Sequence, residues 1–161
     1  MASTWFKRIK KNILTSTKEK KEVPDGLWFK CPGCKKTYTG IEIRENLMVC
    51  PNCHHHHRID AADYFEILLD EGTEDILFNR IVPKDALGFI GLKPYQDRIK
   101  EAQQSTGLLD AMSVAQGEIF GRKILIAAMN FSFIGGSMGS VVGEKIARSI
   151  DHAIAEGLPL L

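Results

Sequence analysis

The four cysteines of this chain have the spacing of metal ligands. They form two pairs, each with two residues between its members, and fifteen residues separate the inner two. Such a spacer lets both thiolates of a pair point at one centre, and Gly33 or Asn52 can supply the positive φ of a tight turn. Zn²⁺ suits four sulfurs at tetrahedral corners best. We therefore predict a zinc ribbon with one Zn²⁺ per chain, held by Cys31, Cys34, Cys50 and Cys53.

Two alternative uses of these cysteines are a pair of disulfides and an iron–sulfur centre. Disulfides are typical of secreted chains, and no apolar stretch of a signal peptide follows the basic residues near the N-terminus. Iron could occupy the same cage. Four thiolates would close the coordination shell, whereas a catalytic zinc keeps one position open. We therefore expect a structural metal in a module too small to bury its own core.

Four consecutive histidines, residues 54–57, follow the last cysteine. One of them could replace a cysteine as a ligand. Because four sulfurs already saturate a tetrahedral metal, we favour an exposed turn that leaves the metal site.

Composition indicates a soluble globular protein, with 44% hydrophobic and 25% charged residues. No apolar run is long enough to cross a bilayer, so no membrane partner is expected. Reduced, metal-binding cysteines indicate a cytoplasmic location. Charge is distributed unevenly, because residues 1–58 carry twelve Lys/Arg against five Asp/Glu (+7) and residues 59–161 carry nine against fifteen (−6). This asymmetry predicts two modules with different electrostatic roles.

The basic N-terminal part allows a nucleic-acid-binding ribbon as an alternative function. Trp28, Phe29 and Tyr38 are available to stack on bases, and the positive charge would favour a phosphate backbone. A ribbon that only docks a partner protein is a further alternative.

The chain divides into three predicted parts: a basic tail and linker (1–26), the ribbon (27–58) and the start of an α/β domain (59–161). The tail is either a short amphipathic helix or a segment that packs on a neighbouring domain. Within the ribbon we expect strand-like pieces at 38–39 and 48–49.

After the ribbon, one helix is expected from Asp60 to Gly72, with Tyr64, Ile67 and Leu68 on one face. A short strand at 76–78 precedes a second helix from Pro94 to Gly107, whose inward residues are Ile99 and Ala102.

The last fifty residues predict two strands, a glycine-rich loop, a helix and a further strand. The strands are 111–119 and 123–131, joined by a turn at 120–122. The helix ends at Gly157 and has an apolar stripe of Val142, Ile146, Ile150 and Ile154. Residues 158–161 resemble the start of a buried strand, so the helix would make a parallel crossover. Because the apolar end has no partner element, we interpret the sequence as the first part of a longer protein.

The loop Gly135–Ser140 joins a strand to a helix N-terminus. Its backbone amides could converge on a phosphate or stabilise an oxyanion. A close-packed turn that needs glycine is the alternative, and spacing alone does not choose between them. No catalytic set of side chains is present. Lys145 and Arg148 could offer charge to a ligand, but we favour a solvated helix face for both, and we expect His152 on the surface rather than as a base.

Three segments of the chain resemble one known family. The run from Asn130 to Ile146, with its Gly-Ser-Met-Gly-Ser core, closely resembles the β subunits of bacterial acetyl-CoA carboxylase carboxyltransferase. The four-cysteine ribbon and the segment Lys100–Gly107 resemble the same family, and the similarity extends from about Trp5 onward. The four histidines depart from the family pattern of one or two, which leaves the zinc ligands unchanged.

This resemblance implies a crotonase-like fold, in which ββα units stack into a spiral and this chain holds the N-terminal portion. It implies transfer of a carboxyl group from carboxybiotin, carried by a biotin carboxyl carrier protein, to acetyl-CoA. The product would be malonyl-CoA for fatty acid biosynthesis. It also implies a carboxyltransferase α subunit as partner, with two α and two β chains in the assembly.

The resemblance further implies that backbone amides stabilise the enolate and the biotin ureido oxygen, with biotin itself acting as the base. The family's later glycine-rich motifs are expected beyond Leu161. We therefore assign no catalytic residues and expect the segment alone to be inactive. Gly135 and Gly136 are candidates for the wall of the active site.

Overall fold

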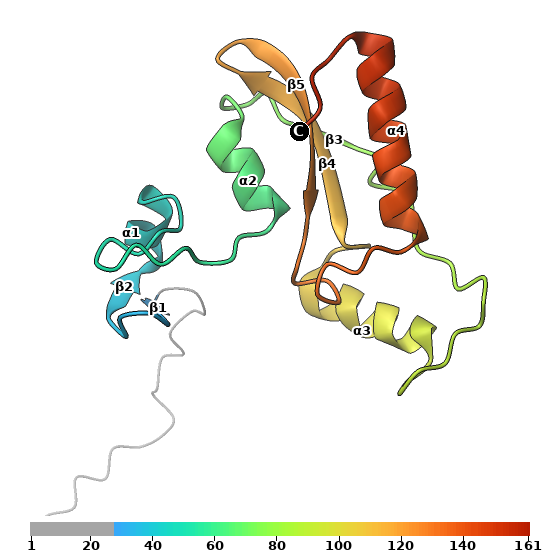
Figure 1. Cartoon of the computed structure of the whole chain (residues 1–161), viewed down its shortest axis with the longest axis horizontal. Helices are drawn as coiled ribbons and strands as arrows, with labels where there is room; N and C mark the ends of the chain where they lie inside the picture. The colour runs from blue at the N-terminus through green and yellow to red at the C-terminus, as the bar shows by residue number, and fades with distance from the viewer. Residues whose placement is uncertain (1–27) are drawn as a thin grey trace, which may run out of the picture.

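The computed structural model describes residues 28–161, so the predicted basic tail (1–26) lies outside the described residues. Figure 1 shows a small ribbon part and a larger part built from a sheet and three helices. The predicted boundary between residues 58 and 59 stays a prediction.

The ribbon part contains two short antiparallel strands, β1 (Trp28–Lys30) and β2 (Thr37–Thr39), followed by helix α1 (Gly40–Glu45). The expected strand at 38–39 is confirmed, whereas at 48–49 only Val49 pairs, in a single bridge to His56.

Helix α1 is absent from our sequence-based expectation. Its start is a capping box, in which the Thr39 backbone N–H donates to Glu42 Oε2 at 2.7 Å and the Glu42 N–H donates to Thr39 Oγ1 at 3.2 Å. The N–H and then the hydroxyl of Thr39 lower the pKa of Glu42. The Thr-x-x-Glu pattern in the sequence was the signal for this helix.

The larger part is built on a three-stranded antiparallel sheet in the order β3-β4-β5. Its strands are β3 (Asp75–Leu77), β4 (Met112–Ile119) and β5 (Arg122–Met129). Its helices are α2 (Ala61–Leu68), α3 (Tyr95–Thr106) and α4 (Ser140–Glu156). These bounds confirm the predicted strand, hairpin, loop and helix order.

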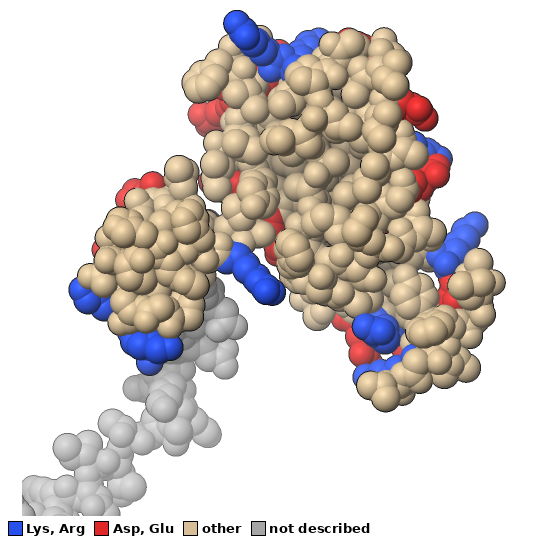
Figure 2. Space-filling view, in the orientation of Figure 1, with Lys and Arg blue, Asp and Glu red and all other residues tan. Residues whose placement is uncertain are grey.

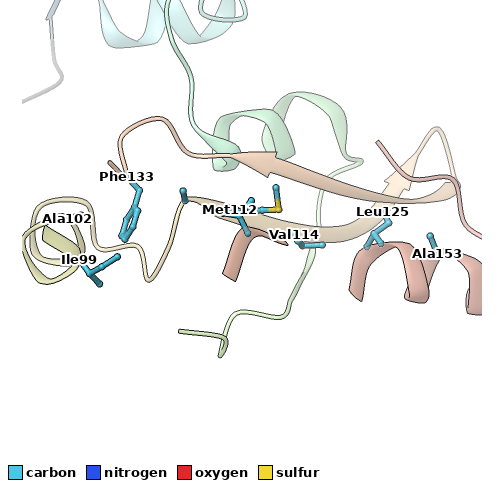
Figure 3. Close-up of a cluster of buried hydrophobic side chains, with 9 residues drawn as sticks. Ile99, Ala102, Met112, Val114, Leu125, Phe133 and Ala153 are labelled. Carbon is cyan, nitrogen blue, oxygen red and sulfur yellow. The ribbon is translucent and has the colours of Figure 1, made fainter. Parts of the chain in front are cut away.

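The two faces of the sheet bury two separate clusters, because successive strand residues point to opposite faces. On one face Val114 and Leu125 belong to a cluster with residues of α3 and α4, shown in Figure 3. On the other face Ala115 and Ile126 pack with Phe65 of α2. Helices α2 and α4 therefore cover opposite faces of the sheet, as Figure 1 shows.

Helix α3 follows the prediction closely. It begins after Pro94 and ends at Gly107, whose φ of 72° is left-handed. Ile99 and Ala102 are its buried residues. The local signals at both ends therefore suffice to define it.

Helix α2 begins after Asp60 and packs Leu68 against the core as predicted, but its predicted end and two residues of its predicted face are wrong. It ends at Leu68 rather than at Gly72, and Phe65 is its buried aromatic residue. Tyr64 and Ile67 are exposed. The α2 sequence is apolar enough that periodicity alone misplaces its buried face by one residue.

The buried face of α4 is also displaced by one residue from the predicted stripe. Val142 is buried and Ile146 packs against the core as predicted, but Ile150 and Ile154 are 44% and 75% exposed. Lys145 and Ser149 are buried in their place. Gly157 ends the helix with a φ of 64°, as predicted.

Residues 158–161 return alongside β5 in parallel orientation, which confirms the predicted crossover. The N–H of Leu125 donates to the Pro159 carbonyl at 3.0 Å, and the N–H of Ala127 donates to that of Leu161 at 2.9 Å. The expected burial of this end is wrong, because Leu161 is 63% exposed.

We expect Phe65→Ala to destabilise the larger part by about 3–5 kcal/mol, because it leaves a cavity between α2 and the sheet. Urea denaturation followed by circular dichroism would measure this loss. The matched control is Tyr64→Ala on the exposed side of the same helix, with an expected loss below about 1 kcal/mol. Equal losses in both variants would contradict the observed packing of α2.

Candidate metal centre and glycine loop

The four cysteine sulfurs meet at one point of the ribbon part. All four Sγ atoms lie within 4.8 Å of one another. The separations are 3.6 Å between Cys31 and Cys53 and 3.7 Å between Cys34 and Cys50. A tetrahedral zinc site with Zn–S bonds of about 2.3 Å has edges of about 3.8 Å. All four cysteines are free of disulfides, so this donor set fits a structural Zn²⁺.

Each cysteine pair is shaped by the same turn. The backbone N–H of Lys35 donates to the Cys31 carbonyl, and the N–H of His54 donates to the Cys50 carbonyl, each at 2.9 Å. Lys35 and His54 carry the positive φ, at 63° and 57°. Our prediction that Gly33 or Asn52 would do so is wrong.

Gly33 is needed for space instead. A Cβ at this position would lie 3.1 Å from Cys53 Sγ and 3.4 Å from His55 Cβ. The absence of a side chain therefore lets the second cysteine pair approach the first.

The electrostatics of the thiols favour a cation among them. Burial raises the pKa of Cys50, but hydrogen bonds from the backbone N–H groups of Cys53 and Asn52 help lower it to about 5. The backbone N–H of His55 lowers the pKa of Cys53, but burial and the neighbouring sulfurs raise it to about 11. Four thiolates in contact repel one another, and a divalent cation at their centre would stabilise all four.

The histidines that follow the second cysteine pair lie outside the sulfur group. Within residues 28–161, the cluster of possible metal ligands consists of the four cysteines alone. His54 and His56 are exposed, and His57 packs edge-on against Phe29 with ring centroids 6.4 Å apart. This arrangement agrees with an exposed turn leaving the metal site.

The glycine loop is a compact turn whose glycines are required. Gly135 and Gly136 have φ values of 67° and 74°. A Cβ at Gly136 would lie 3.2 Å from Cδ1 of Phe131. The Gly136 N–H donates to the carbonyl of buried Phe133 at 2.9 Å, which closes the turn. Both alternatives from the sequence therefore stay open, because a packed turn can also present backbone donors.

The loop does present such donors. Within the described residues, the backbone N–H groups of Ser137 and Met138 have no hydrogen-bond acceptor, and both residues are exposed. They precede the N-terminus of α4, where the helix dipole favours negative charge. The loop can therefore bind an anion or a carbonyl oxygen that gains negative charge.

The three α4 residues that we expected on the helix surface differ in their placement. Arg148 is exposed and pairs with Glu144 at 2.8 Å, as expected for a solvated helix face. His152 is half-buried, and its Nε2 lies 2.7 Å from a glutamine oxygen of β4. Lys145 is buried and pairs with Asp110 at 2.6 Å. The surface position predicted for Lys145 is therefore wrong, whereas His152 is partly exposed.

One residue missed by sequence reasoning is Asn130, at the start of the loop. It is 2% exposed, and its Oδ1 accepts a hydrogen bond from the backbone N–H of Ala61 at 2.9 Å. Its Nδ2 donates to Ser113 Oγ at 3.0 Å. An asparagine that ends an apolar strand was the available signal.

The segment that leaves the ribbon part also lies close to the glycine loop. The guanidinium carbon of Arg58 lies 5.8 Å from the ring centroid of Phe131, the ring that packs on Gly136. This cation–π contact joins the segment after the metal centre to the glycine loop.

Comparison with known sequences matches both parts of the chain. Residues 28–53 match the family described as acetyl-CoA carboxylase zinc finger domain, and residues 89–161 match the carboxyl transferase domain. The acetyl-coenzyme A carboxylase carboxyl transferase subunit beta of Pedobacter heparinus is 51% identical over 157 residues, covering 98% of this chain and 56% of that protein. The subunit of the same name from Amoebophilus asiaticus is 47% identical, with the same coverage.

A solved structure supports the fold. The transcarboxylase 12S crystal structure with hydrolysed methylmalonyl-coenzyme A bound is 20% identical, with a TM-score of 0.50. The match covers 74% of this chain and 19% of that one. It agrees with the crotonase-like fold predicted for the larger part, whereas the zinc ribbon is supported by the family match and the four close cysteines.

Among the described residues, no helix has the length and apolar character needed to span a membrane. The chain spans a little over half the length of the curated relatives that it matches. The ribbon, the glycine loop and these relatives together show that the chain belongs to the family of acetyl-CoA carboxylase carboxyl transferase β subunits.

Proposed function

We propose that this chain belongs to a β subunit that transfers a carboxyl group from carboxybiotin to acetyl-CoA, forming malonyl-CoA for fatty acid biosynthesis. The observation that carries the proposal is the agreement of both parts of the chain, in one order, with β subunits that are 43–51% identical. Because the chain spans about half of those relatives, the activity is proposed for the complete subunit.

The reaction requires a site that stabilises negative charge. The methyl group of acetyl-CoA must lose a proton, and the thioester oxygen must then carry the charge of the enolate. The unpaired N–H groups of Ser137 and Met138 are donors of the required kind. We therefore propose that Gly135 and Gly136 form part of the active-site wall, with the catalytic residues supplied elsewhere in the complete assembly.

The proposed partners are a carboxyltransferase α subunit, in an assembly of two α and two β chains, and a biotin carboxyl carrier protein. The relatives are named as one subunit of a larger enzyme, which supports a multisubunit complex. The exposed apolar residues Leu87 and Leu92 offer surface for such contacts. Free cysteines favour a cytoplasmic location.

We also propose that Cys31, Cys34, Cys50 and Cys53 hold one structural Zn²⁺. The close sulfur positions and the zinc-finger family match support this assignment. The metal would act by folding the ribbon, because four sulfurs leave no open position for a substrate.

Replacing one cysteine should abolish this metal site. In Cys31→Ser we expect loss of stoichiometric zinc, measured by atomic absorption, because three thiolates and a hydroxyl bind the ion far more weakly. The ribbon part should then exchange its amide hydrogens rapidly, while β4 and β5 remain protected.

The matched control is His54→Ala beside the same site, which should retain one zinc per chain. Full zinc retention in Cys31→Ser, or zinc loss in His54→Ala alone, would contradict the four-cysteine assignment.

The proposed activity is tested in the complete subunit with its α partner, by following carboxyl transfer between malonyl-CoA and biotin. We expect turnover in the wild type and a loss of at least about tenfold in Gly136→Val, because the valine Cβ would meet Phe131 in a left-handed backbone.

The control Gly143→Ala adds a Cβ with nothing within 4 Å, and should stabilise α4 by about 0.5–1 kcal/mol without loss of activity. An inactive wild-type complex would refute the carboxyl transfer proposal. Full activity in Gly136→Val would exclude the loop from the active site.

A second candidate function is nucleic-acid binding by the ribbon. Residues 28–58 carry five Lys/Arg against two Asp/Glu, and Trp28 is 63% exposed beside Lys30. Figure 2 shows basic side chains along the lower edge of the ribbon part. We expect binding to single-stranded RNA that weakens steeply with salt and falls in Trp28→Ala, measured by fluorescence anisotropy. Weak binding that is independent of salt would rule out this function.

A further inference from the structure

We propose that the buried ion pair Lys145–Asp110 is a positioning device that fixes the glycine loop, and that Lys145 is a positioning residue for the reaction. The catalytic half of this inference rests on the proposed function. Both side chains are only 5% exposed. Lys145 Nζ donates to Asp110 Oδ2 at 2.6 Å and to the Met112 carbonyl at 2.7 Å.

The ion pair supplies hydrogen-bond partners on one edge of β4, at a point that no neighbouring strand reaches. The carbonyl of Ala111 accepts from the N–H of Asn130 at the end of β5, so by alternation the N–H and C=O of Met112 face the other edge, toward β3. Strand β3 stops at Leu77, opposite Val114. No strand is therefore left to pair with Met112.

The side chains of the ion pair take the place of the missing strand. Asp110 Oδ1 accepts from the Met112 N–H at 2.8 Å, and Lys145 Nζ donates to the Met112 carbonyl. Both backbone groups of Met112 are thereby hydrogen-bonded in a buried place, where an unpaired backbone group would be costly.

Residues 110–113 hold both ends of the connection between β5 and α4, which contains the glycine loop. At the beginning, Asn130 bonds through its backbone to Ala111 and through its side chain to Ser113. At the far end, Lys145 lies in the second turn of α4 and bonds to Asp110 and Met112. The loop therefore spans two anchors on one rigid support.

Little space remains between the loop and this support. A hollow of about 20 Å³ lies beside them, lined by Asp110, Phe133 and Ser137 together with residues of α3, and it has room for a single water molecule. A small rotation of α4 would therefore move the backbone donors of Ser137 and Met138 directly.

Stability alone does not account for a charged pair here. Apolar side chains of similar volume often hold a helix on a sheet as well as a buried ion pair does. Hydrogen bonds add direction, because Lys145 must meet two acceptors on the Asp110–Met112 segment at once. We infer that the ion pair fixes the rotation of α4 about its axis. It thereby fixes the direction in which the backbone N–H groups of Ser137 and Met138 point.

The test is amide hydrogen exchange, read by mass spectrometry, in the 161-residue chain. In Lys145→Met, which keeps the apolar stem, we expect the hydrogen-bonded loop amides of Phe133, Gly136 and Gly139 to exchange about tenfold faster. Amides of β4 and β5 at residues 114–126 should keep their protection. Arg148→Gln, which removes an exposed ion pair of the same helix, should change neither.

Asp110→Asn provides a second variant that keeps the shape of the side chain, and the same local acceleration is expected. Unchanged exchange of the Phe133, Gly136 and Gly139 amides in both variants would overturn the proposal. So would a uniform acceleration over the whole larger part, or loss of folding in both variants, because the pair would then serve folding alone.

The effect of Lys145 on the reaction is measured in the complete subunit with its α partner. We expect Lys145→Met to lower kcat at least about tenfold with KM for malonyl-CoA changed less than about twofold, and Lys145→Arg to restore part of kcat. A rise in KM with kcat unchanged would overturn the positioning role. An inactive wild type would refute the proposed function and leave the exchange experiment as the test of the anchor.

Discussion

The larger part of this protein depends on how the first residues of β4 satisfy their backbone. These residues are buried beyond the end of β3, so their N–H and C=O groups need partners that the sheet does not supply. Asp110 and Lys145 provide them on one edge, and Asn130 on the other. Asn130 also accepts from Ala61 at the start of α2. One short segment thus fixes α2, α4 and the loop between β5 and α4.

The fold of the ribbon part is stabilised in a different way. Within residues 28–58 its buried side chains are few, namely Cys31, Ile43 and Cys50, and so small a set cannot offset the conformational entropy of ordering the segment. We propose that a metal held by the four convergent sulfurs supplies the missing free energy. The two parts can therefore lose stability separately, although Arg58 brings the ribbon exit against the ring that packs on the glycine loop.

Sequence patterns predicted those features whose signals are local. Pro94 and Gly107 defined α3, the turn at 120–122 defined the hairpin, and the cysteine spacing predicted that the four sulfurs converge. The patterns failed where a residue distant in the sequence determines whether a side chain is buried. A lysine is rarely buried unless it is paired, and Asp110, the partner of Lys145, lies 35 residues away. Periodicity gave α2 and α4 an apolar face but could not fix its rotation to within one residue.

The central claim is that Lys145 is a buried, hydrogen-bonded ammonium group in the folded protein. Lysine-selective ¹⁵N NMR tests it directly, because such spectra detect an ammonium group when burial and hydrogen bonds slow the exchange of its protons with water. The account predicts one slowly exchanging lysine signal that disappears in Lys145→Met. A spectrum without such a signal, or one in which the signal persists in that variant, would contradict it.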